Sequence, residues 1–239
     1  MNLYEQIFLR KSVRKYNMTP LAEAELLEME DFIRQMRPLL PDVEIGHRIV
    51  GPEQIKGILT PRAPHYLILS GEAVPYRDLC AGFLFQQLDL YLSYRGFGTC
   101  WLGAAKGRDT PFSKTDILAI SFGEAVGAHT RALSAFKRKP LGEISSGEDP
   151  RLEAARLAPS GINAQPWYFI ARDGVIHVYQ AAAGKLRAMF YDLEELDVGI
   201  ALCHLALATE ALGGVFRFET QGQDAPPAPR GFVYTGTVF

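Results

Sequence analysis

Apolar residues follow helical spacing in some parts of the chain and strand spacing in others. Two long stretches, residues 76–95 and 192–212, predict helices that end at Gly96 and Gly213. Shorter helices are predicted at residues 3–8, 20–37 and 149–157. Runs of β-branched and aromatic residues predict strands at residues 44–50, 64–70, 117–123, 167–171, 175–180, 215–219 and 231–238. Asp173-Gly174 predicts the turn of a hairpin.

The two long stretches share a spacing that suggests a weak internal repeat. When they are aligned at their glycines, four positions match, and each helix follows a hydrophobic strand. The matched pairs are Gly82 with Gly199, Leu88 with Leu205, Leu90 with Leu207, and Gly96 with Gly213. The alternative is that two amphipathic helices ending in glycine look alike without a common origin.

Composition places the chain among ordinary globular proteins. Of its 239 residues, 48% are apolar and 22% are charged, which allows one large core or two small ones. The formal net charge of −2 gives no electrostatic reason to expect nucleic acid or an anionic membrane as a partner. The N-terminus lacks the pattern of a secretory signal, and the longest apolar run, residues 198–208, is too short to span a bilayer. We therefore expect a cytoplasmic protein.

The cysteines and histidines give no sign of a metal site. Cys80, Cys100 and Cys203 are widely spaced and form no CxxC motif. Their odd number favours a reducing compartment, and each is expected to be a small buried apolar residue. The five histidines are scattered, and we expect them to be structural or exposed. The sequence also shows no catalytic triad and no paired carboxylates.

A short polar loop lies between a predicted helix and the strand that begins near Trp167. It carries Ser160, Asn163 and Gln165, which provide one hydroxyl, two amides and no charge. Amides donate and accept hydrogen bonds, so the loop suits a neutral, planar, heteroaromatic ligand, and its prolines stiffen it before binding. The alternative is a plain connection whose polar residues cap the elements on either side.

A basic segment follows the first helix. If this segment is extended, Arg10, Ser12 and Arg14 share one face. Two guanidinium groups beside a hydroxyl suit a phosphate monoester. The alternative is a solvated basic run after a helix C-terminus, where the helix dipole favours cations.

Three motifs resemble those of the FMN-dependent nitroreductase family. Residues 158–167, A-P-S-G-I-N-A-Q-P-W, match nearly all of its flavin-facing loop, A-P-S-x-x-N-x-Q-P-W. Residues 10–14 resemble its R-x-S-x-R segment, and residues 96–103 are similar to its G-x-G-x-x-W-x-G segment. The order of the motifs departs from the family, whose members carry the loop soon after the first helices. Here that part of the chain is a Pro/Gly-rich stretch, residues 51–64, without an amide cluster.

The resemblance implies an α+β fold, namely a nitroreductase-like three-layer α/β/α sandwich with a central, mostly antiparallel sheet. Family members are homodimers with two FMN sites across their interface. Because the motifs are divided here, we expect internal duplication. Residues 1–135 would form a first nitroreductase-like half, and residues 136–239 a second half. The halves would make one compact unit, a pseudo-dimeric monomer with one complete site, and further dimerisation is left open.

The resemblance also implies roles for individual residues. The flavin carries the chemistry, so no catalytic residue and no metal ion are expected. Residues 136–144 resemble the family's R-K-P-L-x-E segment, which places a basic residue near the FMN phosphate; the alternative is a basic linker between the halves. The expected cofactor-binding residues are Arg10, Ser12, Arg14, Arg138 and Lys139 at the phosphate, Leu102 and Gly103 through their backbone at the ring, and Pro159, Ser160, Asn163 and Gln165 at the ring and ribityl chain.

The implied function is that of an FMN-dependent oxidoreductase. NAD(P)H, as co-substrate, would pass electrons through FMN to a small aromatic or quinone-like acceptor by ping-pong hydride transfer. One alternative is a different flavin reaction on the same fold, such as reductive dehalogenation or flavin fragmentation. The other is a non-catalytic flavin-binding protein or a degenerate scaffold of this fold.

Overall fold

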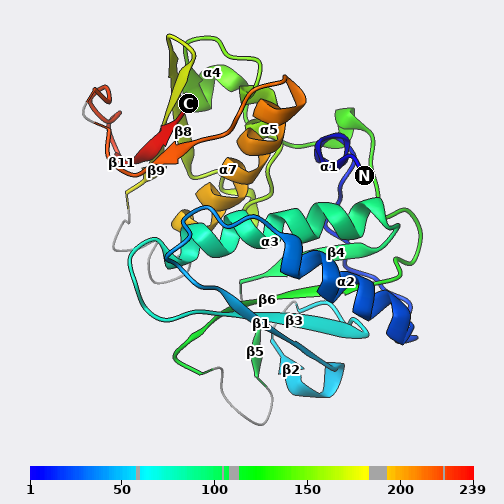
Figure 1. The fold of residues 1–239 in the computed structure, drawn as a ribbon. Coiled ribbons are helices and arrows are strands. Elements are labelled where there is room, and N and C mark those ends of the chain that lie inside the picture. Colours follow the sequence, from blue (N-terminus) through cyan, green and yellow to red (C-terminus); the bar gives the residue numbers. More distant parts are fainter. Residues whose placement is uncertain (58–59, 104, 108–112, 183–192, 223) are drawn as a thin grey trace.

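The first of two β-sheets lies beside helix α3, and the second lies against helix α7 (Figure 1). The computed structural model describes residues 1–57, 60–103, 105–107, 113–182, 193–222 and 224–239. The helices are α1 (Leu3–Ile7), α2 (Glu23–Gln35), α3 (Arg77–Tyr94), α4 (Leu141–Ile144), α5 (Leu152–Arg156) and α7 (Glu194–Ala211). Within the described ranges, no helix combines the length and apolarity that a membrane crossing requires.

The first sheet has four strands in the order β1-β3-β6-β4, and all neighbours are antiparallel. Its strands are β1 (Gly46–Val50), β3 (His65–Ser70), β4 (Gly98–Leu102) and β6 (Asp116–Gly123). The two central strands are buried on both faces, because alternate side chains point to opposite sides. Leu67 and Leu69 join the core around α3, whereas Tyr66 and Ile68 join a second cluster under residues 13–16.

The second sheet has five strands in the order β10-β11-β9-β8-β7. Its strands are β7 (Ser145–Ser146), β8 (Trp167–Arg172), β9 (Val175–Ala181), β10 (Phe218–Glu219) and β11 (Phe232–Val238). Only β7 and β8 are parallel; the other neighbours are antiparallel. The predicted hairpin between β8 and β9 is confirmed, since Asp173 and Gly174 both have positive φ, as a type I′ turn requires. A separate two-stranded ribbon pairs β2 (Ile55–Lys56) with β5 (Lys106–Gly107).

The two long helices cross at a pair of glycines. A Cβ on Gly82 of α3 would lie 2.0 Å from the carbonyl oxygen of Leu196, and a Cβ on Gly199 of α7 would lie 2.0 Å from that of Leu79. Each glycine is therefore required for close contact between the helix backbones. Each is also the sixth residue of an 18-residue helix, so the contacts are reciprocal.

The predicted fold class is confirmed, with corrections at the ends of elements. The described strands form two larger sheets and a two-stranded ribbon instead of one central sheet, and the larger sheets contact different long helices, β4 contacting α3 and β8 and β9 contacting α7. Helix α2 begins at Glu23 instead of residue 20, since the Leu21 N–H donates to His65 Nε2 (2.9 Å) and holds this residue outside the helix. Strand β10 is shorter than predicted, and Val215 before it is exposed. Three free, buried cysteines match the prediction.

Candidate functional site

The basic segment at residues 10–13 is extended, which is the condition on which its side chains were expected to share one face. Arg10 forms an antiparallel bridge with Thr130, and Ser12 forms a parallel bridge with Thr99 of β4. The Val13 N–H donates to the Thr99 carbonyl at 2.8 Å. The segment is therefore fixed on both sides, between the start of β4 and the chain near residue 130.

Arg10 is buried and is oriented by a carboxylate. Its Nε lies 2.7 Å from Oδ2 of Asp89, and its Nη2 donates to the Ser12 hydroxyl at 3.2 Å. Its Nη1 is buried without a hydrogen-bond partner. Asp89 also accepts hydrogen bonds from Gln86 Nε2 (3.0 Å) and from the Thr99 hydroxyl. One donor of the guanidinium is therefore left for a ligand, since unpaired buried donors are rare in folded proteins.

A buried polar chain continues from Asp89 to the other long helix. Gln86 Nε2 lies 3.2 Å from His204 Nε2, and His204 Nδ1 lies 2.8 Å from the Ala154 carbonyl oxygen. Because a carbonyl only accepts, Nδ1 carries the hydrogen and Nε2 accepts from Gln86. Burial lowers the pKa of His204 to about 3, so the ring is neutral near pH 7. The chain thus joins Arg10 to helix α5.

Two further arginines lie near Arg10 and share one aromatic ring. The guanidinium carbon of Arg131 lies 3.6 Å from the Phe136 ring centroid, and that of Arg138 lies 5.8 Å from it. Burial, followed by repulsion from Arg10 and Arg14, lowers the pKa of Arg131 to about 10. Burial, followed by repulsion from Arg10, Arg131 and Arg156, lowers the pKa of Arg138 to about 9. The region therefore holds more positive charge than its neighbours compensate.

The polar loop at residues 157–166 adopts a backbone that is unusual for its residues. Ile162, Asn163 and Gln165 have φ values of 46°, 59° and 51°. Left-handed backbone is costly for residues with a side chain, and most of all for β-branched isoleucine. Ile162 is nevertheless 88% exposed, so core packing does not explain its conformation. Strain of this kind is typical of functional loops.

The two amides of this loop bind the basic segment at residues 137–139. Asn163 Oδ1 accepts from Arg138 Nη1 (2.6 Å), and its Nδ2 donates to the Lys137 carbonyl (2.8 Å). Gln165 Oε1 accepts from the Lys139 N–H (2.8 Å), and its Nε2 donates to the Asn163 carbonyl (3.2 Å). All four polar atoms of the amides are therefore engaged within the chain. The Lys139 ammonium donates to the Ala164 carbonyl (3.1 Å).

The start of α7 connects the loop with the end of β4. The Gly161 N–H donates to the buried Asp197 carboxylate, with distances of 3.1 and 3.2 Å to its oxygens. A Cβ on Gly103 would lie 2.5 Å from Leu193 Cδ1, just before α7. Because strands rise about 3.3 Å per residue, Thr99 and Gly103 are roughly 13 Å apart along β4. The arrangement suits an elongated ligand with an anionic end near Thr99.

The predicted site residues thus fall into one cluster and its surroundings. Arg10, Ser12 and Arg138 lie at the charged end. Arg14 is exposed, with Nη1 3.4 Å from the Ser12 carbonyl oxygen, yet it is close enough to lower the pKa of Arg131. Leu102 is buried at the end of β4 and the adjacent Gly103 is exposed. In the loop, Pro159 is buried and Ser160 Oγ accepts from the Gln165 N–H (2.9 Å).

Sequence reasoning missed several residues of this region. Asp89, Gln86 and His204 interrupt the apolar pattern of the two long predicted helices, and this interruption is the sequence signal that could have revealed them. Arg131 lies in a stretch to which no element had been assigned. Among the described residues, no group of three or more histidine, cysteine or acidic side chains could hold a metal ion.

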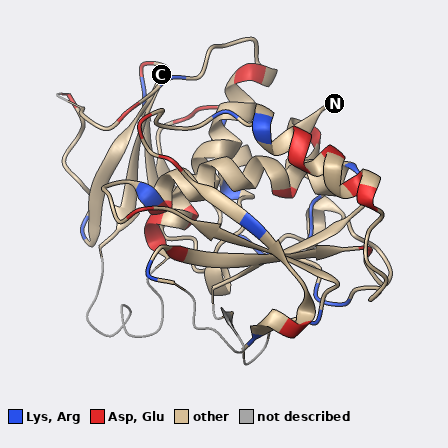
Figure 2. Cartoon of the chain, turned by 60° about the horizontal axis from the view of Figure 1, so that its bottom comes forward, with Lys and Arg blue, Asp and Glu red and all other residues tan. Residues whose placement is uncertain are grey.

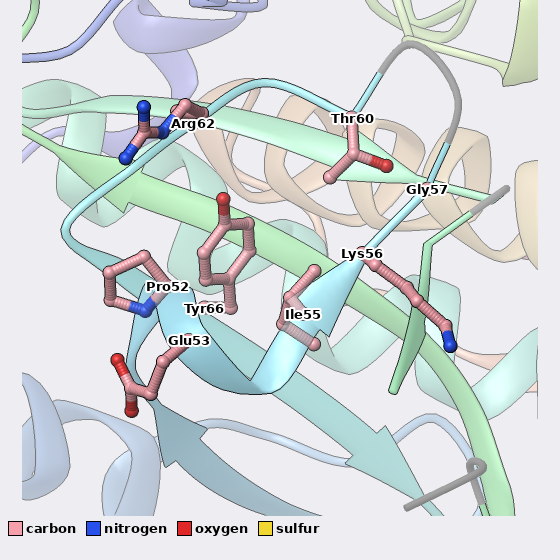
Figure 3. A pocket seen from close by; sticks show the side chains of 8 residues that line it. All are labelled: Pro52, Glu53, Ile55, Lys56, Gly57, Thr60, Arg62 and Tyr66. Carbon is pink, nitrogen blue, oxygen red and sulfur yellow. The ribbon is translucent and has the colours of Figure 1, made fainter. Parts of the chain in front are cut away.

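Two surface hollows lie away from this cluster. One, of about 610 Å³, is lined by Glu53, Lys56, Arg62 and Tyr66 beside β2 (Figure 3). The other, of about 810 Å³, lies at the β8–β9 hairpin around His177. Neither is lined by a predicted site residue. Acidic and basic residues are interspersed along the described chain (Figure 2).

The solved structures that are similar to the chain carry the names of nitroreductase proteins. A "putative nitroreductase" from Thermotoga maritima is 21% identical and covers 100% of this chain and 93% of its own, with a TM-score of 0.70. A nitroreductase family protein from Clostridium difficile is 18% identical and covers 62% of this chain and 99% of its own, with a TM-score of 0.47. An FMN-dependent nitroreductase from the same species is 13% identical, with 55% and 93% coverage and a TM-score of 0.44.

A family model gives the decisive match. None of the curated proteins matches the chain. The model described as "Putative TM nitroreductase" matches residues 2–209, which is most of the chain. This range includes the arginine cluster, the strained loop, all of α3 and most of α7. The chain therefore belongs to this nitroreductase family.

Proposed function

We propose that the chain is an FMN-dependent oxidoreductase that passes electrons from NAD(P)H to a small aromatic or quinone-like acceptor in a ping-pong reaction. The observation that carries the proposal is the arginine cluster, which lies directly beside the strained loop. Other nitroreductase-fold proteins are named NAD(P)H nitroreductases or an FMN-dependent nitroreductase, which agrees with this choice of cofactors.

The charged end fits the phosphate of FMN. Arg10 Nη1 and Arg138 Nε are buried without a hydrogen-bond partner. In the described part of the chain, neither Arg131 nor Arg138 has a carboxylate within ion-pair distance. A phosphate monoester carries close to two negative charges near pH 7 and has three acceptor oxygens. It would accept these free donors and reduce the mutual repulsion of the guanidiniums.

The other end of the site offers backbone and small polar groups to a flavin ring. The Ser160 hydroxyl accepts from Gln165 and keeps its own hydrogen available for donation. Leu102 and Gly103 present main chain at the end of β4. We assign the amides of Asn163 and Gln165 to holding residues 137–139 in place, because all of their polar atoms are engaged there.

These residues bind and orient a cofactor and need not transfer protons. When bound, FMN supplies the hydride and electron transfer. Arg10, Ser12 and Arg138 would hold its phosphate, with Arg14 at the exposed edge. Pro159 and the hydrogen bonds between the loop at residues 157–166 and residues 137–139 keep this side of the site rigid, so little order has to be gained on binding. Asp89 keeps Arg10 in place.

We further propose that the chain is internally duplicated and carries one complete site. The reciprocal contacts of Gly82 and Gly199 support this, as does the matching strand order β1-β3-β6-β4 and β8-β9-β11-β10. In the register that pairs these glycines, Asp89 corresponds to Ala206. The second half thus lacks the carboxylate that orients Arg10 in the first. Residues 1–135 and 136–239 would be the two halves.

The test is the visible absorption spectrum of the purified chain, with and without NADH or NADPH in the absence of oxygen. We expect bound flavin that is bleached by one of the two nucleotides. Flavin that stays oxidised with both would favour the alternative of a non-catalytic flavin-binding protein. Failure to bind added FMN at all would refute the proposed function and leave only the shared fold.

A further inference from the structure

Arg131 is held in place by its backbone, its Nε and an aromatic ring, while its two terminal nitrogens make no hydrogen bond within the described part of the chain. Its N–H donates to the Leu9 carbonyl (2.8 Å), and its Nε donates to the Arg10 carbonyl (3.1 Å). Phe136 lies under the guanidinium at 3.6 Å. In the described part of the chain, Nη1 and Nη2 of Arg131 have no hydrogen-bond partner. A guanidinium that is held on two sides and unpaired on the third is arranged for an external acceptor.

The surroundings of Arg131 indicate the charge of that acceptor. Arg10 and Arg14 both lie close enough to repel it, and it repels Arg138 in turn. The nearby carboxylate of Asp89 is engaged by Arg10 and Thr99. Asp197 attracts Arg138 but forms no ion pair with it, and its carboxylate accepts from the Gly161 N–H. The three guanidinium groups therefore carry more positive charge than the nearby carboxylates neutralise. A singly charged carboxylate would leave this imbalance, whereas a phosphate monoester supplies nearly two charges and three oxygens.

We propose that Arg131 is the third guanidinium of a phosphate-monoester site whose other members are Arg10 and Arg138. The inference rests on the proposed flavin site and extends it to a residue outside the sequence motifs. Arg10 comes from the first strand-like segment, Arg131 from the chain paired with it, and Arg138 from the segment clasped by the loop. Because Arg131 acts on the phosphate alone, it discriminates FMN from riboflavin, which has the same ring and no phosphate.

The test compares flavin affinities of the full chain after removal of bound flavin. Arg131→Met keeps an apolar stem over Phe136 and removes the charge. We expect its FMN dissociation constant to rise about 10- to 100-fold, the loss typical of a charge-assisted hydrogen bond, with riboflavin binding unchanged. The control is Arg34→Met, which removes an exposed arginine of α2 and should change neither affinity. Equal effects of Arg131→Met on both flavins, or no effect on either, would overturn the proposal.

A second variant tests the proposal if Arg131→Met cannot be purified in a folded form. If Arg131→Met does not fold, Arg131→Lys takes its place. It retains the charge without the planar fork and should lose FMN affinity by a smaller factor, again without loss of riboflavin.

An experiment without flavin tests the anion site independently of the proposed function. If the wild-type chain binds neither flavin, the flavin proposal fails, and inorganic phosphate becomes the probe. A rise in the melting temperature with phosphate that Arg131→Met abolishes would still support the anion site. A rise that is equal in both proteins, or absent from the wild type, would refute it.

Discussion

The loops at residues 36–45 and 157–166 occupy corresponding places but have different chemistry. Each joins a helix, α2 or α5, to a strand, β1 or β8, and the strand begins eleven residues after the last residue of the helix. Each also bonds to a long helix through its backbone, the first at Arg37 to the Gln87 side chain of α3 and the second at Gly161 to the Asp197 carboxylate of α7.

Only the second loop has positive φ values and bonds to an arginine without an ion-pair partner among the described residues. No residue in 36–45 has positive φ, whereas three residues of 157–166 do. In the first loop, Arg37 is neutralised by an ion pair with Glu210 and its backbone is bonded to the Gln87 side chain. In the second, the loop holds Arg138, which has no ion-pair partner among the described residues. The first loop is thus closed by an ion pair and by backbone hydrogen bonds, whereas the second holds an arginine that no ion pair among the described residues neutralises.

The largest effect should come from the helix crossing, which both regions share. Gly82→Ala and Gly199→Ala each place a Cβ 2.0 Å from a backbone oxygen, which no side-chain movement can relieve. We expect each to lower the free energy of unfolding by at least about 3 kcal/mol, measured by urea denaturation. The control is Gly142→Ala, where a Cβ meets nothing within 4 Å and the change should stay below about 1 kcal/mol. A strong effect at only one of the two helices would contradict the reciprocal contact.

The next effect concerns the buried chain between the two helices. His204 has a pKa of about 3 in the folded protein and an ordinary value near 6.5 when unfolded. The unfolded chain therefore binds a proton that the folded chain does not, so stability that is present above pH 6.5 is lost as the pH falls toward 3. The loss from this group is about 1.4 kcal/mol per pH unit. Denaturation at several pH values measures the slope, and His204→Gln should reduce it by one proton. An unchanged slope would mean that His204 is not neutral in the folded chain.

A matched pair of substitutions separates the two loops. Asn163 and Asp42 hold the same place, seven residues after the preceding helix. Asn163→Ala removes bonds to Arg138 and Lys137, so we expect a loss of about 1 kcal/mol in stability and several-fold weaker FMN binding. Asp42→Ala, at an exposed position, should change stability by less than about 0.5 kcal/mol and leave FMN binding intact. Similar effects at both positions would remove the distinction between the loops.

The smallest effect is expected at Arg14. This side chain is exposed at the edge of the cluster, so Arg14→Ala should weaken FMN binding only about two- to five-fold at low salt. Added salt should shrink the difference from the wild type, because exposed charges are screened. FMN titrations at two salt concentrations measure it. A loss that is larger than that of Arg131→Met would place the phosphate nearer to Arg14 than we propose.

Local patterns in the sequence predicted most elements of the fold. The apolar runs that became α3, α7, β3 and β9 are long and bounded by turn residues, and their ends were predicted within one or two residues. The sequence aligned Gly82 with Gly199 as positions of a possible repeat, but it did not predict that the two helices cross at these glycines. The division of the strands between two sheets was not visible, because pairing depends on which helix each strand packs against.

Much of the candidate site depends on contacts between distant parts of the chain. The motif at residues 158–167 predicted the loop, but the bonds of Asn163 and Gln165 to residues 137–139 cross some 25 positions. Arg131 gained its place only through pairing with Arg10, which is 121 residues away. The burial of Asp89 likewise follows from the packing of α3 and not from its local sequence.

The central claim is that the chain keeps one flavin site, built where its two regions meet. The most direct test is a titration of the flavin-free chain with FMN, with the stoichiometry measured per chain and the oligomeric state determined in the same sample. We predict one FMN per chain, whether the chain is a monomer or a dimer of chains. Two FMN per chain would contradict the claim, since the loop at residues 36–45 would then also serve a site.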